Sequence, residues 1–152
     1  MSFAVESPIH RKLIDSLYVE AMVLADEARG YFDQIGRNER DGLTPLQRVS
    51  FSCESLKVTT RLMHIIAWLL TQRAVDTGEM PFRDALDPSR RLGAAPISDA
   101  AAVAAMPAQA QSLIAASADL YRRVARLDSA QLEAGAPASP ARSMLDRLAH
   151  AF

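Results

Sequence analysis

In the sequence RLMHIIAWLLTQRA, residues 61–74, every position from Leu62 to Leu70 except His64 is apolar. A helix that is apolar on nearly all sides needs neighbours on more than one side, because its surface would otherwise face water. The run is too short to cross a membrane, and Arg61 and Arg73 bracket it. The stretch therefore predicts the central helix of a helical bundle.

The central helix has a recognisable start and end. Thr44 is placed as the N-cap, Pro45 occupies the first helical position, and Gln47 can complete a capping box. Gly78 can adopt the left-handed conformation that ends helices, so we expect a helix over residues 45–77. At about 1.5 Å per residue this helix is roughly 50 Å long.

Two apolar stripes follow the central helix. The first has the alternating steps of a packing seam and comprises Leu46, Val49, Cys53, Leu56, Thr60, Met63, Ala67, Leu70 and Ala74. The second lies beside it and comprises Phe51, Ser55, Val58, Leu62, Ile65 and Leu69. One neighbouring helix cannot cover both stripes. We expect the first to be a core seam, so that Met63→Asp or Leu70→Asp would unfold the bundle.

Two further long helices flank the central one in sequence. Ser7 and Pro8 begin a helix over residues 8–35, and the polar segment GRNERDGL, residues 36–43, is typical of a connection. Residues 78–98 contain three prolines and indicate a long crossover, with one helical turn near Phe82. A third helix follows over residues 107–128. The predicted fold class is all-α, an antiparallel three-helix bundle over residues 1–128.

One face of the first helix carries a charge where an aliphatic residue would be expected. Glu20 lies either at the edge of the seam with its carboxylate in water, or against an arginine such as Arg61 or Arg122 across the bundle. The opposite face carries Val19, Met22 and Val23 and is too apolar for an ordinary wet surface. This face indicates a second contact, between subunits.

Residues 129–152 form a predicted flexible tail. The stretch SAQLEAGAPASP is rich in small residues, and Ser139 with Pro140 can start a short amphipathic helix over residues 140–151. Its apolar positions are Met144, Leu145, Leu148 and Phe152. A helix this short is marginal alone, so it needs a surface on its own bundle or on a partner.

Composition limits the classes of partner. The chain has 17 basic and 18 acidic residues, a net charge of −1, which gives no broad basic surface for nucleic acid or anionic lipid. The single cysteine, Cys53, forms no internal disulfide, and we interpret it as a small buried side chain. The N-terminal MSFAVESPIHRK lacks the apolar run of a signal peptide, so we expect a soluble, cytoplasmic protein.

No catalytic, cofactor-binding or metal-binding residues can be assigned. His10, His64 and His150 are far apart, and none belongs to a metal-ligand spacing. Neither a glycine-rich phosphate loop nor a nucleophile motif occurs. We therefore expect a protein that is not an enzyme and needs no cofactor.

Two groups of side chains are candidates for protein interaction. On the central helix, a polar wedge surrounds Trp68 and comprises Lys57, Arg61, His64, Thr71 and Gln72. Trp68 either closes the edge of the core with its N–H bonded to a partner group, or anchors a protein interface beside arginine. In the third helix, Arg122, Arg123 and Arg126 either complement the helix dipole or form a basic docking patch for an acidic protein.

Three blocks of sequence resemble a known family. They are EAMVLADEARGYFD (20–33), SLKVTTRLMHIIAWLLTQRAVDTGEM (55–80) and SADLYRRVARLD (117–128), and the family is that of RcdA, the alphaproteobacterial regulator of CtrA degradation. The resemblance covers most of the chain and the order of its three helices. It is most specific in the central block.

The resemblance implies a dimeric three-helix bundle that acts as an adaptor for the protease ClpXP in cell-cycle regulated proteolysis. The implied partners are a second copy of the chain, the unfoldase ClpX primed by a CpdR-like response regulator, cargo proteins and a PopA-like receptor. It also implicates the C-terminal tail in these contacts. The alternative is a dimeric helical interaction module with no link to a protease.

Overall fold

The structure is a computed structural model that describes residues 7–135 and 147–151, and within them it is helical with no strand. The helices are α2 (Pro8–Gly30), the π-helix η1 (Tyr31–Ile35), α3 (Gly36–Asp41), α4 (Pro45–Asp76), α5 (Phe82–Ala85), the 3-10 turn η2 (Pro88–Arg90), α6 (Ala100–Ala104) and α7 (Ala108–Gly135). The all-α class is confirmed for these residues. None of the described helices is long and apolar enough to cross a membrane.

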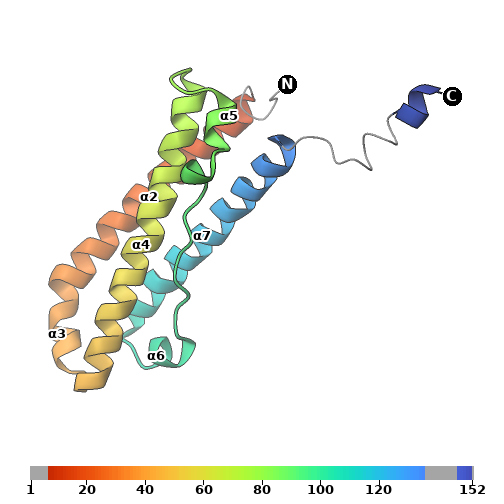
Figure 1. Cartoon of the computed structure of the whole chain (residues 1–152). Coiled ribbons are helices and arrows are strands. Elements are labelled where there is room, and N and C mark those ends of the chain that lie inside the picture. Colours follow the sequence, from red (N-terminus) through yellow and green to blue (C-terminus); the bar gives the residue numbers. More distant parts are fainter. Residues whose placement is uncertain (1–6, 136–146, 152) are drawn as a thin grey trace.

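Three long helices, α2, α4 and α7, pack side by side along the molecule (Figure 1). Helix α2 runs antiparallel to α4, since Tyr18 lies under the Arg73 guanidinium while Phe32 packs on Phe51. Helix α7 instead runs parallel to α4, because hydrogen bonds join Arg61 to Ser117 and then, further along both helices, join residues 72 and 131. The expectation of an antiparallel bundle is therefore wrong for this pair.

The long crossover between α4 and α7 explains the parallel arrangement. It begins at α5, beside the end of α4, and runs back along the molecule to α6, where α7 begins (Figure 1). Hydrogen bonds at three places along its length attach it to the long helices. They join Arg91 to Asp128, the Tyr121 hydroxyl to the Gly93 carbonyl, and Arg61 to the Pro96 carbonyl.

Helix α4 begins and ends as the sequence predicts. The Gln47 amide donates to Thr44 Oγ1 at 3.2 Å, and the Thr44 amide donates to Gln47 Oε1 at 3.0 Å, completing the capping box. The helix ends at Asp76, followed by Gly78 with a φ of +79°, which glycine adopts without strain.

The core lies under the second of the two apolar stripes of α4. Phe51, Val58, Leu62, Ile65 and Leu69 are all buried. The first stripe faces outward: Met63 is 64% exposed and Leu70 49% exposed, and Cys53 is exposed as well. The interpretation of that stripe as a core seam, and of Cys53 as a buried side chain, is wrong. The contacts of α4 with α2 and α7 cover one side of the helix only.

The first helix also departs from its predicted end. After α2 the chain continues through the π-turn η1 and α3, so that residues 36–41 are helical rather than a connection. Tyr31 is buried at the turn and its hydroxyl donates to Glu39. Gly36 permits the turn, because a Cβ there would lie 2.9 Å from the Tyr31 carbonyl oxygen.

Helix α7 is longer than its prediction of 107–128. Residues 129–135, which we expected to belong to a flexible tail, form its last turns, and the Gln131 side chain is buried there. Residues 147–151 form a short helix within the predicted 140–151, and their side chains are exposed. The rest of the predicted tail, including Leu145 and Phe152, lies outside the described residues.

Candidate functional site

The polar wedge on α4 points into the molecule. Trp68 is 1% exposed, and its indole N–H donates to Asp128 Oδ1 at 3.0 Å. The Asp128 carboxylate also receives two hydrogen bonds from Arg91, with Nε to Oδ1 at 2.9 Å and Nη2 to Oδ2 at 2.8 Å. Trp68 thus closes the core, and Asp128 joins α4, α7 and the crossover.

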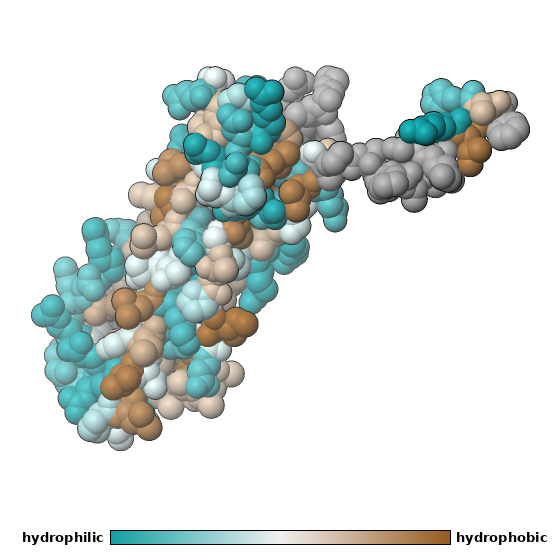
Figure 2. Space-filling model, viewed as in Figure 1, coloured by the Kyte–Doolittle hydropathy of each residue, from teal (hydrophilic) through white to brown (hydrophobic). Residues whose placement is uncertain are grey.

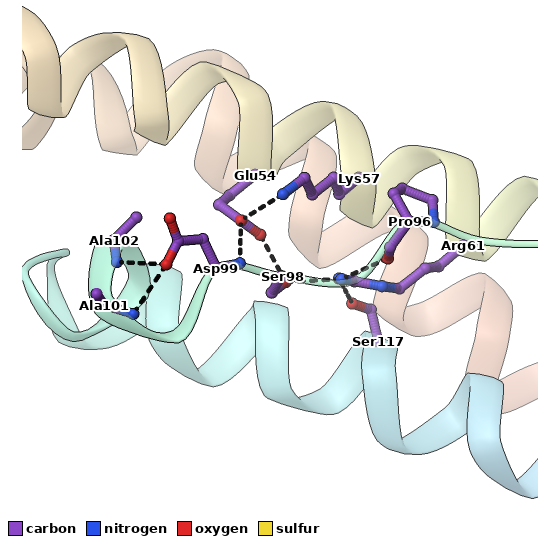
Figure 3. A network of polar contacts seen from close by, with 9 residues as sticks. All are labelled: Glu54, Lys57, Arg61, Pro96, Ser98, Asp99, Ala101, Ala102 and Ser117. Atoms are coloured by element: carbon purple, nitrogen blue, oxygen red, sulfur yellow. Dashed lines mark hydrogen bonds and ion pairs between the residues drawn. The ribbon is translucent and has the colours of Figure 1, made fainter.

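Arg61 is the centre of a second internal polar network (Figure 3). It is 3% exposed and donates to Ser117 Oγ at 3.2 Å, the Pro96 carbonyl at 3.0 Å and Ser98 Oγ at 2.6 Å. Burial lowers the pKa of Arg61, and the Glu54 carboxylate opposes this effect. An arginine stays charged under such a shift, so this network is a fixed set of charge-assisted hydrogen bonds.

Glu54 completes this network from two turns of α4 before the arginine. Its carboxylate accepts from Ser98 Oγ at 2.6 Å, Lys57 Nζ at 3.0 Å and the Asp99 amide at 3.1 Å. Burial raises the pKa of Glu54, but these hydrogen bonds outweigh burial and hold it below its ordinary value. The Ser98 hydroxyl therefore bridges the two buried charges, and the network attaches the crossover to α4 and α7.

The remaining members of the wedge are also packed inside. His64 is half-buried against Gly93, where a Cβ would lie 2.8 Å from Nδ1, and Nδ1 has no hydrogen-bond partner. Gln72 is 1% exposed and accepts a hydrogen bond from the Gln131 side chain. The four candidates from the wedge are therefore within the fold of the single chain, where they position α7 and the crossover.

The three arginines of α7 are all accessible at the surface of the bundle and differ in their partners. The Arg122 side chain is 64% exposed beside Asp119, and Arg126 is exposed. Arg123 forms an ion pair with Glu20 across the bundle. Glu20 therefore pairs with an arginine across the bundle, and this arginine is Arg123 rather than Arg61 or Arg122. Arg122 and Arg126 are accessible to a protein partner, as is Leu148, which is 49% exposed.

A groove lies between the crossover and α7. It has a volume of about 680 Å³, and its lining is mainly apolar. Its walls include Pro96, Ile97, Ala104, Ala115, Ala118 and Arg122. The groove lies beside the Arg61 network, so the hydrogen bonds of that network fix the position of one wall. We call it the α7 groove.

A ridge of apolar side chains follows the outer side of α4. It consists of the large members of the first stripe, which are exposed by 49–77%: Leu46, Val49, Leu56, Met63 and Leu70. Arg40, Arg48 and Cys53 border its first half, around a hollow of about 390 Å³.

On α2, Val19, Met22 and Val23 are exposed by 45–60%. Figure 2 shows apolar residues gathered at several places among polar ones on one face of the molecule. Such faces are typical of protein contacts.

The chain matches a family model and a solved structure among known proteins. A family model described as a protein of unknown function, DUF1465, matches residues 5–152. The crystal structure of RcdA from Caulobacter crescentus CB15 matches with a TM-score of 0.64 and 34% identity, covering 78% of this chain and 90% of that chain. The chain belongs to the RcdA family. A comparison with curated proteins finds no match.

In this member of the RcdA family, sequence reasoning missed three residues that carry the internal networks. Glu54, Arg91 and Asp128 were not singled out, although two of them had a signal. Glu54 falls between Phe51 and Val58 on the buried stripe, and Asp128 continues the three- and four-residue steps of α7 after Val124. A charge at a core position indicates a buried polar partner. The described residues contain no group of His, Cys, Asp and Glu that could hold a metal ion.

Proposed function

We propose that this protein is a non-enzymatic adaptor that delivers substrates to the ClpXP protease in cell-cycle regulated proteolysis. The observation that carries the proposal is its 34% identity to RcdA of Caulobacter crescentus over 90% of that chain. An adaptor needs surfaces rather than reacting groups. Tethering raises the local concentration of cargo to about the millimolar range for a short linker, so weak contacts suffice.

The proposed partners follow from the family resemblance. They are the unfoldase ClpX, a CpdR-like response regulator that primes it, cargo proteins and a PopA-like receptor, all in the cytoplasm. Exposed groups that fit protein partners are Arg122, Arg126 and Leu148. The proposal includes no nucleic acid and no membrane partner, in keeping with a net charge of −1.

The proposed assembly is a homodimer through the α4 ridge. From Leu46 to Leu70 the ridge is about 36 Å long at about 1.5 Å per residue, which is long enough for helix-to-helix packing between two copies. From Val49 to Leu70 its apolar side chains recur every seven residues, which is the heptad repeat of a helix pairing seam. The bundle of α2, α4 and α7 then serves as the folded body, and the segment after Gly135 serves as the contact tail.

A binding experiment with purified proteins tests the adaptor proposal. The chain is mixed with ClpX and a CpdR-like response regulator, and complex formation is followed by gel filtration with light scattering. The adaptor proposal predicts a complex that contains all three proteins. A folded dimer that binds neither ClpX nor the primed complex would contradict it and favour an interaction module without a protease link.

A further inference from the structure

The α7 groove has several alanines among its lining residues. Ala104, Ala115 and Ala118 line it, and Ile97 at its edge is 89% exposed. A groove of about 680 Å³ is large enough for several bulky side chains. Because five of its fourteen lining residues are alanine, the groove leaves room for bulky side chains of an occupant.

The groove is preformed by hydrogen bonds beneath it. Arg61 holds the Pro96 carbonyl and the Ser117 hydroxyl, and the Tyr121 hydroxyl donates to the Gly93 carbonyl at 2.7 Å. Gln111 holds the turn before α7 through the Met106 carbonyl at 2.8 Å. A site fixed in this way loses little conformational freedom when it is filled, which favours binding.

We propose that the α7 groove is the docking site of the chain's own segment 140–152. The segment carries four bulky apolar residues at helical spacing: Met144, Leu145, Leu148 and Phe152. Its described part, residues 147–151, is helical and exposed, and Leu148 is 49% exposed. A helix this short gains stability only by covering an apolar surface. The proposal goes beyond the adaptor function and does not depend on it; a partner that contacts Leu148 has to displace the segment from the groove.

The length of chain between α7 and this helix allows the docking. From Gly135 to Pro140 the chain has 5 steps, from 140 − 135, and can span up to about 17 Å. Residues 140–147 add about 10 Å as a helix, so Arg147 can lie up to about 27 Å from Gly135. The groove residue Ala118 lies 17 residues before Gly135, from 135 − 118, or about 26 Å along α7. The linker and the start of the helix together therefore just reach the groove.

Tethering favours the chain's own segment over the same segment of a second copy or of another protein. A short linker gives an effective concentration in the millimolar range, which free peptides in a cell seldom reach. The α4 ridge projects outward, and the hollow beside its first half is smaller, at about 390 Å³.

Nuclear magnetic resonance on isotope-labelled protein tests this docking. We compare the full chain with a chain that ends at Gly135, and then add the synthetic peptide PARSMLDRLAHAF to each. The proposal predicts that truncation shifts the amide signals of Ala104, Ala115 and Ala118, and that the peptide reverses the shift. The peptide should bind the full chain at least about tenfold more weakly, because the tethered segment already fills the groove.

Matched substitutions in the full chain separate docking from loss of the segment. Leu148→Asp should reproduce the groove shifts of the truncated chain, whereas Ser143→Asp, on the opposite face by helical spacing, should leave them unchanged. Either of two results would overturn the proposal: unchanged groove signals on truncation, or shifts confined to Leu56, Met63 and Leu70. A further control adds unlabelled full chain at micromolar concentration to labelled truncated chain. If this addition reverses the groove shifts, the segment docks between copies and the proposal is overturned.

Discussion

At the scale of single residues, the interior of this bundle depends on charges as well as on apolar packing. Glu54, Arg61 and Asp128 are each less than 10% exposed, and each has at least three hydrogen bonds to other residues. A buried charge is tolerated only when its hydrogen-bonding capacity is met. Removing one member therefore costs more than an average core substitution of the same size.

Arg61→Leu should lower the free energy of unfolding by about 2–4 kcal/mol. The substitution leaves the Pro96 carbonyl and the Ser98 and Ser117 hydroxyls without their buried donor. Urea denaturation measures the change, and Arg126→Leu on the exposed side of α7 is the control, with an expected change within about 0.5 kcal/mol. Equal effects of the two substitutions would contradict the role given to Arg61.

Glu54 should make the stability depend on pH in the acidic range. Its pKa in the folded chain lies below the ordinary value of 4.5, so its carboxylate stabilises the fold above about pH 4.5. This contribution is lost as the pH falls through the lower pKa of the folded state. Urea titrations at several pH values measure this loss. The free energy of unfolding of the Glu54→Gln variant should fall less steeply with decreasing pH than that of the unchanged chain. Glu27→Gln, at an exposed position, should retain the full slope.

At the scale of helices, the fold depends mainly on which of the two apolar stripes of α4 faces the core. The capping box at Thr44 and the end of α4 at Gly78 were predictable, because caps depend on a few adjacent residues. Which stripe is buried was not predictable from spacing, since both stripes are apolar and both recur at helical steps. Contacts with α2 and α7 settle this choice, and a single sequence does not contain them.

The parallel direction of α7 could have been predicted from the sequence, although we expected an antiparallel bundle. A connection of about 20 residues can span roughly 66 Å or more, longer than the roughly 50 Å of α4. Such a connection returns the chain to the start of α4, after which the next helix runs parallel to it. The length of segment 78–98 was therefore a usable signal. Short loops favour antiparallel neighbours, and this segment is not short.

Adjacent substitutions on α4 test the assignment of its two faces. Leu69 is fully buried and Leu70 is 49% exposed. Leu69→Asp should abolish cooperative thermal unfolding, because it places an unpaired charge in the core. Leu70→Asp should leave the fold intact and weaken self-association through the α4 ridge, measured by circular dichroism and sedimentation. If Leu70→Asp unfolds the chain and Leu69→Asp does not, the faces are assigned wrongly.

At the scale of the whole molecule, the candidate interaction residues separate into two groups. Arg61, His64, Trp68 and Gln72 hold the crossover and α7 in place, whereas Arg122, Arg126 and Leu148 are accessible. The helical wheel grouped the first four correctly as one face. It could not reveal that a crossover distant in sequence covers this face, because the pattern of one helix contains no information on such contacts.

Truncations near the end of α7 should separate the folded body from the contact segment. A chain that ends at Gly135 should remain folded, lose substrate delivery, and lose only the stability that docking of segment 140–152 contributes. A chain that ends at Ala130 should melt at a lower temperature, because it lacks Gln131, which bonds Gln72, and Gly135, which Leu86 approaches closely. Thermal unfolding by circular dichroism measures both. Identical melting of the two chains would show that the last turn of α7 does not contribute to the body.

The measurement that tests the adaptor proposal most directly is the degradation of a cell-cycle cargo by purified ClpXP and a CpdR-like response regulator, with and without this protein. We predict that the rate of cargo loss increases when the folded protein is added, and that the unfolded Leu69→Asp variant gives no increase. An unchanged rate in the presence of the folded dimer, for every cargo tested, would contradict the adaptor function.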